Sequence, residues 1–385
     1  MSYQEIEDRY STGVYPKRDV VIVRGEGAAL WDENGRRYVD CVGGHGAANL
    51  GHCNPAVVKA VQEQVARLTD CTEIFHNDAR ARCLRKLVEV LPAGVDRIFL
   101  CNSGTEAVEG ALKFARMATG RQEIVAFMRG FHGRTMGALS ATWDPKYREP
   151  FMPLVPGFKH VPYDNVEAVR EAVNDNTAAI LVEIVQGEGG VRPGSAEFLL
   201  ALAEISRESG ALLIVDEIQT GFGRTGKMFA CQHYGLTPDI VCLAKSIAGG
   251  LPMGAFALGP RVQNVIKMAH GSTFGGNPVA CAASVAAIQY IQDENLPARA
   301  AELGAEFVAR LRGIKADTVR EVRGLGLMVG VELRQKATPL LRALMDRGVL
   351  ALPAGPTVVR FLPPLVIERS ELLGVADVVA ELLSA

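Results

Sequence analysis

Lys245 and Asp216 are the two residues whose types and positions most strongly indicate chemistry in this sequence. Asp216 directly follows the apolar run 211–215, and Lys245 directly follows a second run, 239–244. Each run has the length and β-branched content of a buried strand in a parallel sheet. Because open α/β sheets bind ligands beyond the carboxyl ends of their strands, a carboxylate and an amine are predicted to meet at such a site.

A lysine beside an aspartate suits one cofactor especially well, pyridoxal phosphate. The amine of Lys245 can hold it as a Schiff base, while Asp216 keeps its ring nitrogen protonated. The sequence around Gly104 fits the same hypothesis, because free N–H groups at a helix start attract a phosphate. The spacing of Ser103 and Glu106 is also that of a simple capping box, which would serve the helix alone. The presence of the lysine and the aspartate favours the phosphate site.

Further candidates follow other predicted strands. Phe131 could stack on a planar cofactor, and Arg134 could bind a carboxylate, although a core phenylalanine beside a solvated arginine is the simpler interpretation of this pair alone. Glu183 and Glu188 end a strand in a glycine-rich turn, where they could equally be surface charges. Arg360 lies among apolar residues and needs an anionic partner unless it points to solvent; we favour a carboxylate partner.

The overall composition excludes several classes of protein. The 385 residues carry a formal net charge of −2, which gives no electrostatic case for binding nucleic acid or an anionic membrane. The acidic start lacks the apolar stretch of a secretory signal, so a cytoplasmic protein is expected. The eight cysteines contain no CxxC and are predicted to be reduced thiols, and the spacing of the seven histidines indicates no metal site. The GxGxxG at 221–226 lacks the βαβ context of a dinucleotide site.

Periodicity and turn signals indicate an α/β protein with two domains. Residues 28–40 are predicted to form a hairpin whose turn takes its positive φ values from Asn34 and Gly35. Strands at 97–101, 123–128 and 178–185 alternate with helices at 55–68 and 105–117, which implies a mostly parallel sheet covered by helices. The predicted division is an N-terminal segment, 1–48, that joins the smaller domain, a large cofactor-binding domain, 49–276, and a C-terminal smaller α+β domain, 277–385.

Seven segments resemble, in the same order, motifs of the class III aminotransferases, which are pyridoxal phosphate enzymes of fold type I. They are NSGTEAVEGALKFAR, RGFHGRT, EIVQGEGGVRP, LLIVDEIQTGFGRTG, PDIVCLAKSIAGGLPMGA, HGSTFGGNP and VRFLPPL. The resemblance covers essentially the whole chain and implies a seven-stranded type of large sheet between helices, plus a smaller domain. Segments 12–15, 143–148 and 354–360 look most like the acetylornithine aminotransferase group, and within it like relatives that act on lysine precursors attached to an amino-group carrier protein.

The resemblance implies a role for each matching residue. Lys245 would carry the Schiff base, Asp216 would pair with the ring nitrogen, Gln219 would approach the phenolic oxygen and Phe131 would stack on the ring. The phosphate would be bound by Ser103, Gly104 and Thr105, joined by Thr273 from the other subunit of a homodimer. Arg134 and Ser272 would face the substrate.

Arg360 would hold the α-carboxylate of glutamate or 2-oxoglutarate, and Glu188 would pair with Arg360 when an ω-amino substrate occupies the site. A movable glutamate lets one site accept both substrates without leaving a buried charge unpaired. His45 departs from the family pattern, because relatives often carry tyrosine or an apolar residue there, and this leaves the fine substrate specificity open.

The expected activity is a ping-pong ω-aminotransferase of lysine biosynthesis. It would act between carrier-linked lysine or aminoadipate semialdehyde and glutamate or 2-oxoglutarate, and N-acetylornithine of arginine biosynthesis is the competing amine. A class III mutase, decarboxylase or racemase would share the fold, whereas a nucleotide-dependent oxidoreductase or a scaffold protein would not use the lysine. Lys17, Arg18 and Arg24 could meet an acidic carrier, or could equally form a solvated surface.

Overall fold

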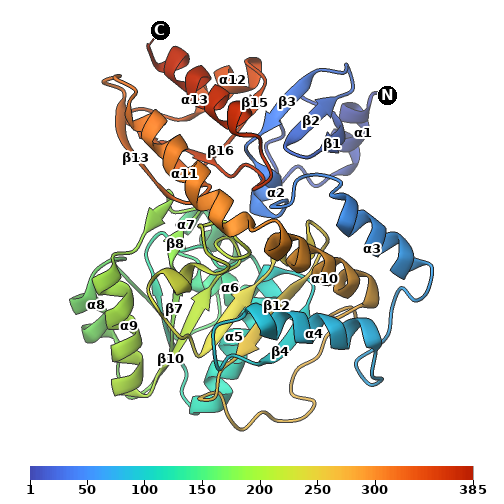
Figure 1. Ribbon diagram of the computed structural model, residues 1–385. Coiled ribbons are helices and arrows are strands. Elements are labelled where there is room, and N and C mark those ends of the chain that lie inside the picture. The colour runs from blue at the N-terminus through green and yellow to red at the C-terminus, as the bar shows by residue number, and fades with distance from the viewer. Residues whose placement is uncertain (385) are drawn as a thin grey trace.

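The computed structural model describes residues 1–384 and is built around a large seven-stranded sheet with helices on both faces (Figure 1). The strand order is β4-β12-β11-β10-β7-β5-β6, and only β12 runs antiparallel to its neighbours. This confirms the predicted α/β class and the mostly parallel sheet. Its strands are β4 Arg97–Cys101, β5 Glu123–Phe127, β6 Phe158–Val161, β7 Thr177–Glu183, β10 Leu212–Asp216, β11 Ile240–Leu243 and β12 Gly254–Leu258.

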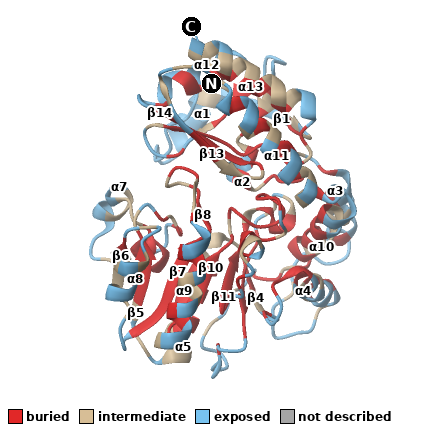
Figure 2. Ribbon diagram, turned by 60° about the vertical axis from the view of Figure 1, so that its left-hand side comes forward, coloured by how far each residue is buried: buried red, intermediate tan, exposed pale blue. Residues whose placement is uncertain are grey.

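The central strands are buried on both faces, which explains their nearly continuous apolar sequences (Figure 2). Successive side chains enter two different cores: Ile214 packs in the core beneath α5 (Gly104–Thr119), and Val215 packs in the core on the opposite face. Helix α9 (Ala196–Ser209) contacts β10 and β7 from that second face. Because successive side chains of a strand point to opposite faces, the apolar strands pack against helices on both sides of the sheet.

The register of the central strands brings the chemical residues together. Asp216, the last residue of β10, lies opposite Glu183 at the end of β7 and opposite Cys242 of β11. Lys245 follows β11 and begins the short 3-10 helix η3 (Lys245–Ala248). Three carboxyl-terminal strand ends therefore deliver their charged side chains to the same edge of the sheet.

Two four-stranded sheets lie outside the large sheet, and a two-stranded sheet pairs β8 (Val185–Gln186) with β9 (Arg192–Pro193). Strands β13 Val319–Leu325, β14 Met328–Leu333, β17 Val358–Phe361 and β16 Leu352–Pro353 form one sheet, which contacts α11 (Leu296–Arg312). The N-terminal strands β1 Ile22–Glu26, β2 Ala29–Asp32 and β3 Arg37–Asp40 form the other with β15 Val349–Leu350. The N-terminal and C-terminal segments therefore lie in the same part of the molecule (Figure 1).

The predicted division into domains stays a proposal, and the packing bears on each of its boundaries. The pairing of β3 with β15 favours an N-terminal segment that belongs with the C-terminal part. Helix α10 (Pro278–Asp293) packs mainly on α3 (Pro55–Val65) and α4 (Asp78–Val90). These contacts favour placing the end of the large domain after α10 rather than at residue 276.

The predicted hairpin is present as β2 and β3, but its turn differs from the prediction. Gly35 alone has a positive φ, of 79°, and the Asp32 side chain accepts the N–H groups of Asn34 and Arg36. A side-chain-capped loop therefore replaces a two-residue turn. The remaining elements are α1 Tyr3–Tyr10, α2 Gly43–Gly46, α6 Met136–Ala141, α7 Pro145–Arg148, η1 Glu149–Phe151, α8 Val166–Ala172, β8 Val185–Gln186, β9 Arg192–Pro193, η2 Ala230–His233, α12 Thr338–Asp346 and α13 Arg369–Ser384.

Candidate active site

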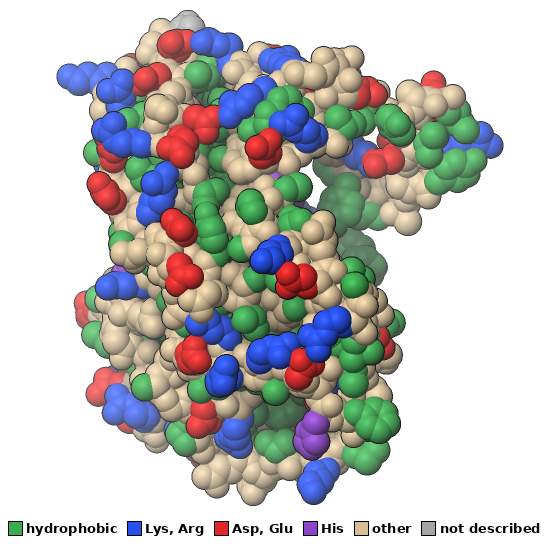
Figure 3. All heavy atoms as spheres, turned by 45° about the vertical axis from the view of Figure 1, so that its right-hand side comes forward, with side chains coloured by type: hydrophobic (Ala, Val, Ile, Leu, Met, Phe, Trp, Pro, Cys, Tyr) green, Lys and Arg blue, Asp and Glu red, His purple; other side chains and the backbone are tan. Residues whose placement is uncertain are grey.

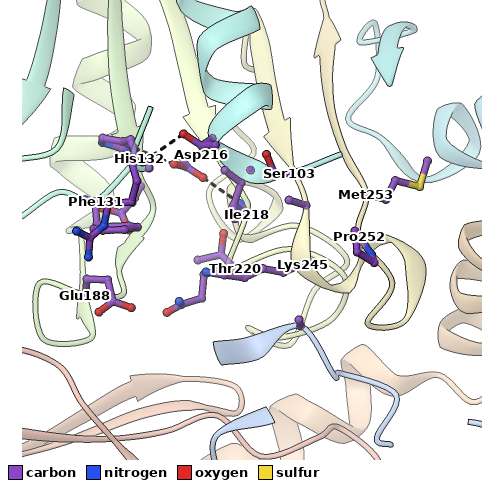
Figure 4. Close-up of a pocket in the computed structure, with 18 of the residues that line it drawn as sticks. Ser103, Phe131, His132, Glu188, Asp216, Ile218, Thr220, Lys245, Pro252 and Met253 are labelled. Atoms are coloured by element: carbon purple, nitrogen blue, oxygen red, sulfur yellow. Dashed lines mark hydrogen bonds and ion pairs between the residues drawn. The ribbon is translucent and has the colours of Figure 1, made fainter. Parts of the chain in front are cut away.

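A cavity of about 380 Å³ opens beyond the carboxyl ends of the central strands (Figure 4). It is lined by segments that lie far apart in the sequence and that carry most of the predicted site residues. Those on its wall are Ser103, Gly104, Thr105, Phe131, Arg134, Glu188, Asp216, Gln219 and Lys245. Arg360 reaches the same site from β17 through its contacts with Glu188 and Gln219.

Lys245 is held in a backbone conformation that few residues other than glycine adopt. Its φ is 49°, which for a side chain with a Cβ costs on the order of 1 kcal/mol or more. The next residue, Ser246, anchors the turn, because its hydroxyl donates to the carbonyl of Gly46 at 2.9 Å. Burial lowers the pKa of Lys245, against the opposing charge of Glu188. A lowered pKa increases the fraction of neutral amine, which is the nucleophilic form.

Asp216 belongs to a buried polar cluster beneath the cavity. Its carboxylate accepts the backbone N–H of Ile218 at 3.0 Å and contacts His132 Nδ1 at 2.8 Å (Figure 4). Glu183, on the neighbouring strand, accepts the backbone N–H groups of Phe131 at 3.0 Å and Gly187 at 3.2 Å. The cluster therefore fixes both the aspartate and the loop that carries Phe131.

The ionisation of this cluster is strongly perturbed. Burial raises the pKa of Glu183 to about 7, although the His132 charge opposes that shift. Burial acts to lower the pKa of His132, but the hydrogen bond to Asp216 and the negative charges of Asp216 and Glu183 together outweigh burial and raise this pKa above its ordinary value. A protonated His132 compensates the negative charge of Asp216 at the bottom of the cavity.

The start of α5 has the features required to hold a phosphate. Ser103 caps this helix by accepting the N–H of Glu106 at 3.3 Å, so the helix cap and the cavity wall share one segment. The first N–H groups of a helix have no partner within the helix, and here they border the cavity. A Cβ on Gly104 would lie 2.9 Å from the side chain of Ile218, so a larger residue at this position would have to displace Ile218. The Thr105 hydroxyl is held 2.7 Å from that of Thr135.

Arg360 is almost completely buried and is paired with Glu188. The two side chains approach to 2.7 Å, and a second guanidinium nitrogen donates to Gln219 Oε1 at 3.1 Å. Arg360 Nε has no hydrogen-bond partner among residues 1–384. Burial acts to raise the pKa of Glu188, but Arg360 and Lys245 hold that pKa below its ordinary value. Glu188 is thus an ionised carboxylate paired with a buried guanidinium that keeps one free donor.

Arg134 stands at the opening of the cavity, where it is both exposed and part of the lining. Its guanidinium carbon lies 3.7 Å from the ring centroid of Tyr147 and 5.3 Å from that of Phe131. Among residues 1–384 it has no carboxylate within ion-pair distance. An unpaired guanidinium held by aromatic rings can bind a carboxylate with two parallel hydrogen bonds.

Three predicted or suspected residues lie outside this cavity. Ser272 Oγ accepts the N–H of Gly275 and the Asn102 amide, at 3.0 and 3.2 Å, and Thr273 is exposed. His45 lies in the glycine-rich turn α2, with a left-handed φ of 59°, and is exposed. The structure does not bring these side chains into the cavity of their own chain.

The sequence reasoning missed His132 and Tyr147 as parts of the site. His132 stands between the predicted residues Phe131 and Arg134, and its contact with Asp216 spans 84 residues of chain. Tyr147 lies within the segment 143–148, which sequence patterns did not connect with the site. The position of His132 next to Phe131 could have indicated that His132 belongs to the site. No local sequence pattern indicates that Tyr147 packs on Arg134.

The sequence profile of the family described as "Aminotransferase class-III" matches residues 11–383. The chain is a class III aminotransferase. This aminotransferase is 56% identical over 370 residues to the LysW-aminoadipate semialdehyde transaminase of Deinococcus radiodurans, covering 95% of the chain and 86% of that relative. It is 49% identical to the acetylornithine aminotransferase of Methanopyrus kandleri over 375 residues, covering 97% and 96%. The resemblance stated from the motifs is thereby confirmed.

Solved structures of relatives confirm the fold and the cofactor class. An ornithine aminotransferase of Toxoplasma gondii, whose structure shows partial occupancy of pyridoxal phosphate at the active site, has a TM-score of 0.95 at 37% identity. The match covers 99% of this aminotransferase and 93% of the Toxoplasma chain. The enzyme is a fold-type I transferase that depends on pyridoxal phosphate. The cradle at Gly104, the ring of Phe131 and the Lys245–Asp216 pair fit this group. No cluster of three potential metal ligands occurs in residues 1–384.

Proposed function

We propose that this aminotransferase moves an amino group between glutamate and the terminal aldehyde of aminoadipate that is attached to an amino-group carrier protein. The observation that carries this proposal is the buried Arg360–Glu188 pair beside Lys245. A fixed arginine suits glutamate, and a glutamate gate neutralises it while an ω-amine is bound. The name of the Deinococcus relative supports the carrier-linked substrate.

The proposed roles of the residues follow from the geometry. Lys245 would hold pyridoxal phosphate, Asp216 would keep its ring nitrogen protonated, and Gln219 would approach its phenolic oxygen. Ser103, Gly104 and Thr105 would bind the phosphate. Bound pyridoxal phosphate supplies a conjugated ring that delocalises the electron pair left when the substrate carbon loses a proton. Lys245 Nζ is the base that takes this proton and later returns it.

N-acetylornithine is the second candidate amine, because several relatives, including that of Methanopyrus, are named acetylornithine aminotransferases. The two amines present the same reacting end, a primary amine on an aliphatic chain, and differ beyond it. The cavity around Lys245 therefore accepts the shared end, and the part of the substrate outside the cavity decides between lysine and arginine biosynthesis.

The deciding experiment compares kcat/KM for carrier-linked lysine and for N-acetylornithine, with 2-oxoglutarate as acceptor. We expect a preference of several orders of magnitude for the carrier-linked amine. Better turnover of free N-acetylornithine would overturn the proposed substrate and place the enzyme in arginine biosynthesis. Activity with neither amine would overturn both assignments while leaving the family intact.

Replacing Glu188 with glutamine should separate the two half-reactions. The amide keeps the shape of the side chain but cannot neutralise Arg360, so a buried charge faces the ω-amine. We expect kcat/KM of the amine half-reaction to fall about 10- to 100-fold, while the glutamate half-reaction stays near that of the wild type. Stopped-flow absorbance of each half-reaction measures the effect, and Glu188→Asp, which keeps the charge, is the control. An equal loss in both half-reactions would contradict the role of Glu188 as a gate.

We propose that the enzyme is a homodimer in which Thr273 and Ser272 serve the partner's site. Large apolar side chains are exposed in the segments 74–75 and 266–274, and Arg80 links the first segment to Gly276 by donating to the carbonyls of Phe75 and Gly276. They are Ile74, Phe75, Ile266, Met268 and Phe274, and Met268 is 99% exposed. Exposed apolar side chains of this size are candidates for a subunit interface. Light scattering should give twice the 41.3 kDa of one chain. A mass that remains at one chain throughout the assay range would contradict the dimer.

On the face shown in Figure 3, no patch of a single charge is available to dock the carrier. Basic and acidic side chains are interspersed over the face shown in Figure 3. The three basic residues that could meet a carrier already have contacts of their own: Lys17 pairs with Glu7 at 2.8 Å, Arg18 donates to Ala351 and Arg24 packs 4.0 Å above Trp31. No helix among residues 1–384 has the length and apolar character to cross a membrane. A cytoplasmic location stays a prediction.

A further inference from the structure

We propose that Tyr147 is a positioning residue, which holds the Arg134 guanidinium at the opening of the cavity so that Arg134 binds the carboxylate of the amine substrate. The inference rests on the proposed function only in taking that substrate to be an ω-amino acid. The contact that carries it is the 3.7 Å separation between the guanidinium carbon and the Tyr147 ring centroid. This is the approach of a cation over a ring face.

The aromatic support extends behind Arg134. The rings of Tyr147 and Phe131 meet edge to face, with centroids 5.8 Å apart and planes at 81°. Arg134 lies against both of them, at the opening of the cavity whose wall includes Phe131. The guanidinium is therefore stacked by one ring and supported by a second. Stacking restricts its long side chain to one region and leaves its N–H groups free for an anion.

Tyr147 lies on a short helix that is anchored at its start. It belongs to α7, a four-residue helix that begins at Pro145 and is capped by Asp144, whose side chain accepts the N–H of Lys146 at 3.1 Å. The N–H of Trp143 donates to the carbonyl of Gly130 at 2.9 Å. This hydrogen bond connects the segment that leads into α7 with the loop that carries Phe131 and Arg134. A side chain on an anchored turn can hold a partner at a constant distance.

The opening of the cavity lacks an internal anion for Arg134. Glu188 is paired with Arg360, and Asp144, which caps the start of α7, is paired with Lys146 at 2.8 Å. Lys245 lines the same cavity and is less exposed than Arg134. An ω-amine that places its nitrogen at Lys245 therefore extends its carboxylate end toward the free guanidinium of Arg134.

The test uses the half-reaction of the holoenzyme with two synthetic amines. One is 6-aminohexanoate, which is lysine without its α-amino group, and the other is hexylamine, which lacks the carboxylate. The ratio of their kcat/KM values measures binding of the carboxylate and does not depend on which natural amine the enzyme uses. The absorbance change of the bound cofactor reports both reactions.

We expect Tyr147→Leu to lower this ratio about 3- to 10-fold, mainly through KM for 6-aminohexanoate, because a cation over a ring contributes a comparable factor. Tyr147→Phe keeps the ring and should stay within about twofold of the wild type. Arg134→Met should remove the preference. An unchanged ratio in Tyr147→Leu, or an equal loss with both amines, overturns the proposal. Failure of the proposed function is recognised separately, by rejection of both natural amines by the wild-type enzyme.

Discussion

Replacing Lys245 with alanine is expected to abolish multiple turnover, with a loss of at least about 10⁴-fold in kcat, because this one side chain both holds the cofactor and moves the substrate proton. The residue is placed for both tasks at the wall of the cavity, in a left-handed conformation that Ser246 anchors. Steady-state production of glutamate from 2-oxoglutarate and the amine measures the loss.

Two controls separate chemistry from folding. Lys245→Arg keeps a positive charge in the cavity but offers no neutral amine, so it should be as inactive as the alanine variant. Borohydride reduction should add the cofactor covalently to the wild-type protein and to neither variant, as intact mass shows. A small primary amine in solution should restore part of the activity of Lys245→Ala only. Multiple turnovers by the untreated alanine variant would refute the assignment of Lys245.

The central part of the site was predictable because the end of a buried strand is visible in the local sequence. Asp216 and Lys245 each follow a buried apolar run, and neighbouring parallel strands must end at one edge of the sheet. The capping-box spacing of Ser103 and Glu106 predicts the neighbouring helix from residue 105; the helix begins one residue earlier, at Gly104, where the helix cap and the border of the cavity occupy one segment. Residues at strand and helix ends are therefore the ones that sequence patterns locate well.

Contacts between loops were not predictable in this way. Tyr147 packs on Arg134 because of how α7 is anchored to Gly130, and no periodicity encodes that distance. Arg224, in the GxGxxG segment, illustrates the same limit: its buried guanidinium donates to Asn49 and to the carbonyls of Leu327 and Pro363. A motif that suggests a nucleotide therefore serves here to join distant parts of the chain.

At Arg360 the role implied by the resemblance agrees most directly with the geometry of the structure. Local sequence required only some anionic partner for this arginine, and resemblance named Glu188. The structure places the two side chains 2.7 Å apart beside the cavity, with Arg360 Nε still without a partner among residues 1–384. A buried cation that keeps a free donor beside a partly exposed acid has the properties of a site used by two substrates in turn.

Replacing Asp216 with alanine should lower kcat about 10²- to 10³-fold, the effect expected when a preorganised charge is removed from the site where charge develops. Lys245 remains, so borohydride should still attach the cofactor to this variant. Asp216→Asn keeps the shape of the side chain but loses its negative charge, and we expect the same loss of rate.

The loss must be separated from an effect on stability, because Asp216→Ala also leaves buried His132 without its partner. That change costs about 1–3 kcal/mol of folding free energy, which a thermal unfolding curve of the variant would show. Asp216→Asn retains an acceptor for His132 and should unfold closer to the wild type. If slow catalysis accompanies both substitutions while only the alanine variant is markedly less stable, the charge of Asp216, and not its packing, is what the reaction requires. A near-normal rate in Asp216→Asn would remove its proposed role at the ring nitrogen.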